Sequence, residues 1–235
     1  MQREIIEQGA REMGQELPPS AGAAFEIYRE LLEKHNQIIN LTALTDTSDI
    51  ARLHFLDSLA MRNAAKFDGA RVLDVGSGAG FPGVPLKIAE PSMSLTLLDA
   101  TMKRVRFLEE LCGALHLQAS CLHGRAEELG HDAEHRETYD IAVSRAVARL
   151  NILCELCLPL VKIGGVMIAM KTEDCGDELT VAHRAIETLG AELEQCAAYT
   201  IPGTDVTRRA VVIRKISQTP DKYPRRFAKI TREPL

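Results

Sequence analysis

The chain has 235 residues, of which 46% are hydrophobic and 26% charged, so it can bury one substantial core and a small appended subdomain. No apolar stretch approaches the length of a membrane span, and the N-terminal sequence Met-Gln-Arg-Glu-Ile-Ile-Glu-Gln is too acidic for a signal peptide, so we expect a cytoplasmic protein. The net charge is −5, and six irregularly spaced cysteines in a chain of this size are typical of reduced thiols.

The first 66 residues are predicted to be helical. Apolar residues recur at helical spacing in two segments, at Phe25, Tyr28, Leu31 and Leu32 and again at Ile50, Leu53, Phe55, Leu56 and Met61. We therefore expect an N-terminal helical subdomain over residues 1–66, joined near 67–69 to a second domain over 67–235. His54, Asp57 and Ser58 have i, i+3 and i+4 spacing. They face either a ligand cleft or local hydrogen-bond partners, and the sequence does not decide between the two.

From residue 71 onward, apolar runs alternate with helical patterns. Strands are predicted near 71–75, 94–99, 118–123, 139–144, 164–171 and 209–215, with one more within 190–201. Such alternation predicts an α/β fold with a doubly wound, mostly parallel seven-stranded sheet, whose last two strands form a reversed hairpin. Cys154 and Cys157 lie in an apolar helical pattern, and a lone Cys-x-x-Cys is a poor zinc site, so we expect core thiols and no metal.

A glycine-rich loop follows the first strand of this sheet. Gly76, Gly78 and Gly80 permit positive φ and the close approach of a ligand to the backbone. A dinucleotide register also fits Gly78, Gly80 and Gly83, so the glycines alone leave a dinucleotide, S-adenosylmethionine and a structural turn open.

Residues around the loop favour S-adenosylmethionine. Asp74 is suited to anchoring the loop and to meeting a cationic amino-acid tail, which nicotinamide cofactors lack. Asp99 ends the second strand, where an acid can accept both ribose hydroxyls, a role that by itself suits either cofactor. Ala126 and Glu127 follow the third strand, where an adenine ring can meet backbone groups.

Basic residues follow the later strands. Arg145 comes after the fourth strand, at the carboxyl edge where open α/β sheets bind ligands, although an arginine there can also pair with a neighbouring acid. Lys171 ends the fifth strand, as either an RNA contact or a solvated charge. Residues 208–235 contain nine Lys or Arg and two acids. This basic tail includes Arg225, Arg226 and Lys229, which can neutralise phosphates or simply be solvated.

Taken in order, these segments resemble the RsmG (GidB) family of bacterial 16S ribosomal RNA guanine-N7 methyltransferases. The matching stretches are residues 40–44 (Asn-Leu-Thr-Ala-Leu), 54–59 (His-Phe-Leu-Asp-Ser-Leu), 74–83, 97–99 with 103–108, 144–146 (Ser-Arg-Ala) and 223–226 (Tyr-Pro-Arg-Arg). The chain departs from the family at His35, where tryptophan is usual, and at Ala100 and Ala228, where Ser and Gly are common.

The resemblance implies a class I, Rossmann-like methyltransferase that transfers a methyl group from S-adenosylmethionine to N7 of one guanine in small-subunit ribosomal RNA. It assigns the cofactor to Gly76, Phe81, Ala126, Glu127 and Arg145, to which the residue argument adds Asp74, Gly78 and Asp99. We expect RNA contacts at Arg145, Lys171, Arg225, Arg226 and Lys229, no catalytic base, and a monomer. The alternatives are a methyltransferase of a small molecule or protein, a non-enzymatic cofactor-binding regulator and, least favoured, a dinucleotide-dependent oxidoreductase.

Overall fold

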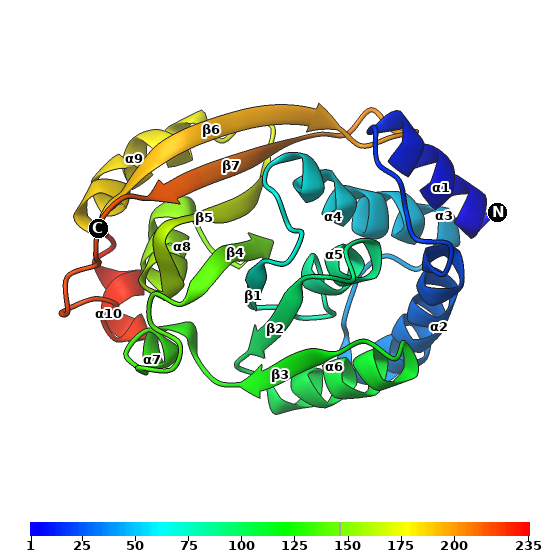
Figure 1. Cartoon of the computed structure of the whole chain (residues 1–235), viewed down its shortest axis with the longest axis horizontal. Helices are drawn as coiled ribbons and strands as arrows, with labels where there is room; N and C mark the ends of the chain where they lie inside the picture. The colour runs from blue at the N-terminus through cyan, green and yellow to red at the C-terminus, as the bar shows by residue number, and fades with distance from the viewer. Residues whose placement is uncertain (146) are drawn as a thin grey trace.

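A seven-stranded mixed sheet forms the centre of the molecule (Figure 1). The computed structural model describes residues 1–145 and 147–235, so Ala146 of the motif at 144–146 lies outside the described residues. The strands are β1 (Arg71–Val75), β2 (Ser94–Asp99), β3 (Ala119–His123), β4 (Tyr139–Arg145), β5 (Val161–Thr172), β6 (Ala191–Thr200) and β7 (Thr207–Lys215). Their order is β3-β2-β1-β4-β5-β7-β6, and β7 runs antiparallel to both of its neighbours. The predicted sheet and its final reversed hairpin are confirmed.

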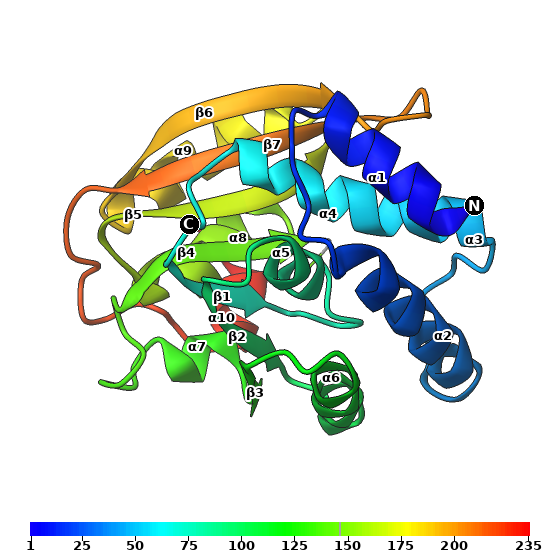
Figure 2. The same cartoon turned by 45° about the vertical axis from the view of Figure 1, so that its right-hand side comes forward.

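Helices cover both faces of this sheet (Figure 2). One face packs against α1 (Gln2–Glu12), α2 (Ala21–Ile39), α5 (Gly83–Ala89), α6 (Met102–Ala114) and the helical run from α3 (Thr47–Asp49) through η1 (Ile50–Leu56) and α4 (Asp57–Leu59) to η2 (Ala60–Asn63). The other face packs against α7 (Ala126–Leu129), α8 (Leu150–Cys157), η3 (Leu158–Leu160), α9 (Gly176–Thr188) and α10 (Phe227–Arg232). Cys154 and Cys157 are fully buried in this second core, as predicted.

The N-terminal helices share one hydrophobic core with the sheet. The rings of Phe25 and Phe55 lie 4.8 Å apart, and Phe55 lies 5.9 Å from Phe81 of the glycine-rich loop. The same buried cluster continues to Val143 of β4 and Ile168 of β5. All regular secondary structure described within residues 1–66 is therefore helical. The domain boundary at residue 66 stays a prediction.

Two chain features set the position of the ligand edge. The strand order reverses between β1 and β4, so α5 and α8 leave this pair of strands on opposite faces. Such a reversal opens a crevice at the carboxyl ends of the strands. The loop after β1 and Arg145 at the end of β4 both lie there. None of the described helices is both long enough and apolar enough to cross a membrane.

Candidate functional site

The glycine-rich loop is held by β2 as well as by its own strand. The amides of Gly76 and Ser77 both donate to the carbonyl of Leu98, at 2.9 and 3.0 Å. Gly76 and Gly78 have φ of +73° and +59°, a region that strongly favours glycine. A Cβ on Gly76 would lie 2.6 Å from the side chain of Val147, whereas one on Gly78 would meet only a backbone oxygen at 3.9 Å. The loop is therefore crowded at its start and open at Gly78.

Asp74 lies beneath this loop and is completely buried. Its Oδ2 accepts a hydrogen bond from the amide of Gly83 at 2.8 Å, which joins β1 to α5, while its Oδ1 has no hydrogen-bond partner. Burial raises the pKa of Asp74 from 3.8 to about 7. A buried, unpartnered acceptor favours a bound cation or donor nearby, and the ammonium group of S-adenosylmethionine fits that requirement.

Asp99 connects the end of β2 to the same loop. Its Oδ2 accepts from the amide of Gly78 at 2.9 Å, and its Oδ1 accepts from the amide of Thr101 at 2.8 Å. Arg104 lies 3.7 Å from Oδ2. Each carboxylate oxygen keeps acceptor capacity for a hydroxyl group. Asp99 is therefore both a loop anchor and a candidate ribose acceptor.

Two cavities flank the loop. The loop cavity, of about 440 Å³, is lined among others by Gly76, Gly78, Phe81, Asp99 and Arg145. The α7 cavity, of about 160 Å³, is lined by Val75, Gly76, Leu98, Ala100, Gly124, Arg125, Ala126, Glu127, Val147, Leu156 and Phe227. The two share Gly76, Ala100 and Val147. Every residue predicted at the cofactor lines one of these cavities except Asp74, which supports the loop from below.

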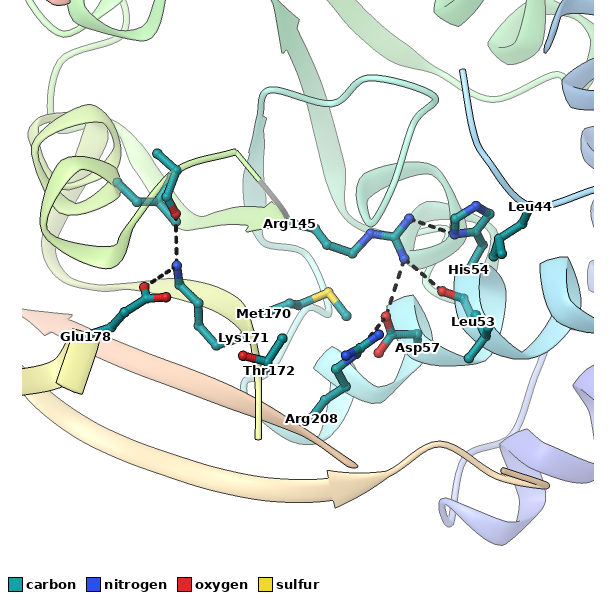
Figure 3. Close-up of a pocket in the computed structure, with 12 residues that line it drawn as sticks. Leu44, Leu53, His54, Asp57, Arg145, Met170, Lys171, Thr172, Glu178 and Arg208 are labelled. Carbon is teal, nitrogen blue, oxygen red and sulfur yellow. Dashed lines mark hydrogen bonds and ion pairs between the residues drawn. The ribbon is translucent and has the colours of Figure 1, made fainter. Parts of the chain in front are cut away.

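Arg145 reaches from the end of β4 to the N-terminal helices (Figure 3). Its guanidinium donates to the carbonyl of Leu53 at 3.3 Å and to Nδ1 of His54 at 3.1 Å, and it lies 3.5 Å from Oδ2 of Asp57. It also lies over the ring of Phe81, 4.7 Å from its centre. Arg145 therefore pairs with a neighbouring acid and also lines a cavity, and its contact with a ligand stays a prediction.

His54 is held neutral by its surroundings. Because Nδ1 accepts from Arg145, Nε2 carries the proton and donates to Oγ1 of Thr42 at 2.7 Å. Burial, reinforced by the charge of Arg145, lowers the pKa of His54 to about 3. The imidazole stacks on Phe81 at 4.5 Å. The imidazole of His54 therefore contacts both Arg145 and Phe81.

The two other residues left open by the sequence have different roles. Ser58 donates to the carbonyl of His54 at 2.6 Å and is a local helix contact. Asp57 faces Arg145 and also accepts from the hydroxyl of Tyr199 at 2.9 Å. Their position beside η1, a stretch of π-helix, was not foreseen from the sequence; such stretches are frequent at functional sites.

A third cavity, of about 510 Å³, lies on the other side of Arg145 and is called the Arg145 cavity. Its lining residues are Leu44, Leu53, His54, Asp57, Arg145, Ala148, Leu153, Met170, Lys171, Thr172, Glu178 and Arg208. Lys171 lies 2.6 Å from Glu178 and donates to the carbonyl of Ala148 at 2.9 Å. These contacts argue against a simple phosphate contact for Lys171, because its charge is already compensated.

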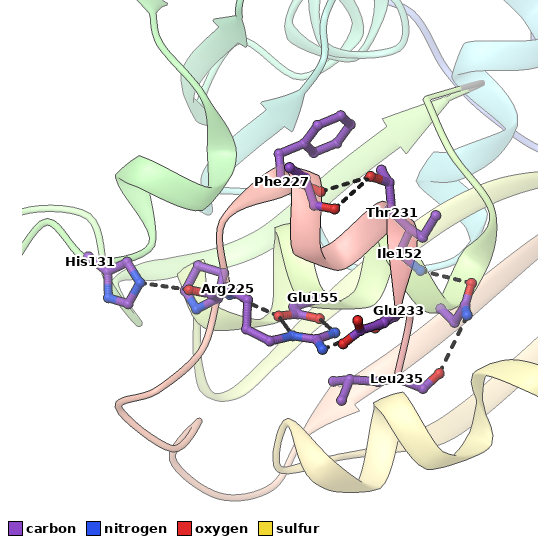
Figure 4. A network of polar contacts seen from close by, with 11 residues as sticks. His131, Ile152, Glu155, Arg225, Phe227, Thr231, Glu233 and Leu235 are labelled. Carbon is purple, nitrogen blue, oxygen red and sulfur yellow. Dashed lines mark hydrogen bonds and ion pairs between the residues drawn. The ribbon is translucent and has the colours of Figure 1, made fainter.

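The basic tail does not form the continuous cationic strip that its sequence suggests (Figure 4). Both guanidinium donors Nε and Nη2 of Arg225 bind the fully buried carboxylate of Glu155, at 2.8 and 2.6 Å. This pairing argues against the predicted phosphate contact of Arg225, because Nε and Nη2 bind a buried carboxylate and Nη1 donates to the carbonyl of Glu233 at 3.0 Å. Arg226 and Lys229 are exposed, and within the described part of the chain neither has a carboxylate within 4 Å.

Two residues of the site were missed in the sequence. The hydroxyl of Tyr28 in α2 donates to the carbonyl of Ala79 at 2.6 Å, so an N-terminal helix holds the glycine-rich loop. Phe227 lines the α7 cavity from the C-terminal segment. For Tyr28 the only sequence signal was a tyrosine in an apolar helical pattern. For Phe227 there was no signal. Within residues 1–145 and 147–235 no cluster of three or more His, Cys, Asp or Glu has the arrangement of a metal site.

Known proteins are similar to this chain in sequence and in fold. The family model "rRNA small subunit methyltransferase G" (GidB) matches residues 22–207. A ribosomal RNA small subunit methyltransferase G from Alkaliphilus oremlandii is 45% identical, covering 99% of this chain and 98% of the relative, and one from Lachnoclostridium phytofermentans is 44% identical, covering 97% and 95%. A solved S-adenosylmethionine-dependent methyltransferase from Aquifex aeolicus has a TM-score of 0.56 at 16% identity, covering 75% of this chain and 97% of that one, which shows a shared fold.

Proposed function

Since the chain belongs to the ribosomal RNA small subunit methyltransferase G family, we propose that it transfers a methyl group from S-adenosylmethionine to N7 of one guanine in the 16S ribosomal RNA. It acts in the cytoplasm as a monomer on the RNA or on the small ribosomal subunit. The residue roles given below are part of this proposal.

The observation that carries the proposal is the position of Arg145 between two cavities. The loop cavity and the Arg145 cavity share Arg145 and His54 as lining residues. One cavity is bounded by the glycine-rich loop and Asp99, and the other combines apolar walls with charged groups and holds about 510 Å³. This arrangement supports transfer between a methyl donor held at the loop and a flat polar base in the neighbouring cavity.

The residues of the site act by positioning and electrostatics. When bound, S-adenosylmethionine supplies a methyl group on a positively charged sulfur. Guanine N7 has an available lone pair, so no side chain has to remove a proton. Gly76, Gly78 and Asp99 hold the donor, and Ala126 with Glu127 borders its adenine. The rate enhancement then comes from alignment of the reacting groups and from charge stabilisation in the cavity.

The carboxylates beside the acceptor cavity have an electrostatic task. Methylation at N7 leaves a positive charge on the purine. Asp57 and Glu178 both line the Arg145 cavity, where they pair with Arg145 and Lys171 and so offset cationic charge that would oppose that purine cation. Arg226, which immediately precedes α10, and Lys229 within α10 are exposed and bind phosphates of the RNA, in place of Arg225.

The proposal is tested by incubating the protein with methyl-labelled S-adenosylmethionine and small subunits, or 16S ribosomal RNA, from a strain that lacks the enzyme. We expect one labelled guanine, identified by chain cleavage at 7-methylguanine. Subunits from the parent strain, already methylated, are the control. Absence of label from guanine N7 in both substrates would overturn the proposed activity.

A second experiment tests the loop assignment. Gly76→Asp is expected to abolish calorimetric binding of S-adenosylhomocysteine, because its Cβ would lie 2.6 Å from Val147 and its charge would enter the loop. Gly14→Asp is the matched control, since Gly14 has a similar φ of +70° and no atom within 4 Å of an added Cβ. Equal affinity of the two variants would refute the assignment of the loop.

A further inference from the structure

The C-terminal segment after β7, residues 216–235, returns across the face of the sheet that carries α7, α8 and α9. It ends in α10, whose Ile230 is completely buried in the core of that face. The family model ends at residue 207, so neither it nor the glycine-rich loop assigns a role to this segment. Its exposed basic residues suggest RNA binding, and its buried contacts indicate a second task.

Three contacts fix the segment just before α10. The guanidinium and the amide of Arg225 bind the buried carboxylate of Glu155 in α8, with the amide at 2.8 Å from Oε1. Arg136 donates to the carbonyls of Thr219 and Tyr223, at 2.7 and 2.9 Å. The ring of His131 bonds to the carbonyl of Pro224 at 2.7 Å. An ion pair with a completely buried carboxylate is costly to break, so the backbone at residues 223–226 has a defined position.

Phe227 is placed by these contacts at the α7 cavity. In Figure 4 its ring points away from the Arg225–Glu155 pair, at the opposite side of the helix from Glu233. Phe227 is 38% exposed, although the segment that precedes it is anchored. Among the described residues that line the α7 cavity it is the one aromatic side chain.

Small side chains share the α7 cavity with Phe227. Gly76, Ala100, Gly124 and Ala126 line it together with the phenylalanine, and the cavity holds about 160 Å³. The guanidinium of Arg125 lies over the ring, 5.8 Å from its centre. A partly exposed ring that lines a cavity of this size together with glycines and alanines offers a stacking surface for a planar base.

We propose that Phe227 contacts the adenine base of the bound cofactor, and that the Arg225–Glu155 pair serves to hold it there. The C-terminal segment is then the closing wall of the nucleoside end of the cofactor site. This inference rests on the proposed function, because it assumes an adenine-containing cofactor at the glycine-rich loop.

Calorimetric binding of S-adenosylhomocysteine tests this role without requiring turnover. Stacking on an aromatic side chain typically contributes about 1–3 kcal/mol per base, so Phe227→Ala should raise the Kd by on the order of tenfold, and Phe227→Tyr should restore it. Arg232→Ala is the matched control on the same helix, 73% exposed and outside the cavity lining. Thermal unfolding of each variant verifies that the fold is kept.

A fluorescent reporter locates the contact. The chain has no tryptophan, so Phe227→Trp introduces a single indole next to the proposed adenine site. Adenosine and S-adenosylhomocysteine should both change its emission, methionine alone should not, and Arg232→Trp should respond to none of them.

The outcomes separate the two proposals. If the unaltered protein does not bind S-adenosylhomocysteine, the proposed function fails together with this inference. If the unaltered protein binds and the Kd of Phe227→Ala is within twofold of its Kd, only the role of Phe227 is overturned. The same holds if adenosine does not change the emission of the indole at position 227.

Discussion

Replacing Asp74 by asparagine should make the ligand-free protein more stable at alkaline pH relative to the unaltered chain. Asp74 is completely buried, and one of its oxygens has no hydrogen-bond partner. Asparagine keeps the same shape, and its carbonyl can still accept from the amide of Gly83. The substitution therefore removes the buried titratable group, while the amide nitrogen that replaces the unpartnered oxygen adds a cost that does not change with pH.

The magnitude follows from the pKa of this carboxyl group. Burial raises it from 3.8 to about 7 in the folded protein. A raised folded-state pKa contributes stability that is fully present below the unfolded value and is lost as the pH rises through the folded value. A shift of about three units at 1.36 kcal/mol per unit corresponds to roughly 4 kcal/mol, lost between about pH 4 and pH 8. Asparagine does not titrate and loses none of it.

Urea unfolding followed by circular dichroism at pH 4, 6 and 8 measures this difference. The free energy of unfolding of Asp74→Asn minus that of the unaltered chain should rise by roughly 4 kcal/mol over this range. Asp205→Asn, which removes an exposed carboxylate, is the matched control for the loss of one acidic side chain. A change with pH for Asp74→Asn no larger than that of this control would refute the reasoning. The ammonium group of S-adenosylhomocysteine favours the ionised carboxylate, so its binding to the unaltered protein should release a proton at pH 6, measurable by calorimetry in two buffers.

Three further outcomes are expected. Tyr28→Phe removes the hydroxyl that donates to the buried carbonyl of Ala79 in the glycine-rich loop, so it should lower the free energy of unfolding by about 1–3 kcal/mol and weaken the binding of S-adenosylhomocysteine. Unchanged affinity would show that the loop does not depend on this bond. Combined Arg226→Ala and Lys229→Ala should reduce the slope of log K against log salt for 16S ribosomal RNA by about 1.5 in filter binding, and an unchanged slope would remove both from the RNA interface. The imidazole carbons of His54 should show no titration by nuclear magnetic resonance between pH 5 and 8, because its pKa is lowered to about 3; a titration in that range would contradict its bond to the arginine.

The sheet could be predicted closely because its strands carry local signals. The strands at 71–75 and 94–99 are short, largely apolar runs, of which the first is followed by Gly76 and the second ends at Asp99, and both have the predicted bounds. The fifth strand is longer than predicted, since it begins at Val161 and continues through Gly164 and Gly165, which interrupt the apolar pattern.

The polar contacts of the site were less accessible to sequence reasoning. Asp74 and Asp99 bond within one loop region, so their roles as anchors follow from position alone. Arg145 meets residues about 90 positions earlier, and Arg225 meets a carboxylate 70 positions earlier. No periodicity or spacing encodes such pairs, because they depend on how helices pack on the finished sheet.

The bond from Tyr28 to Ala79 and the aromatic contacts around Phe81 make the N-terminal helices and the ligand loop one cooperative unit. Amide protons in α2 and at the start of α5 should therefore exchange with solvent through a common opening, and a ligand at the loop should slow exchange in both. A ligand bound at residues 76–81 should in this way also stabilise α2, which begins some fifty positions earlier in the chain.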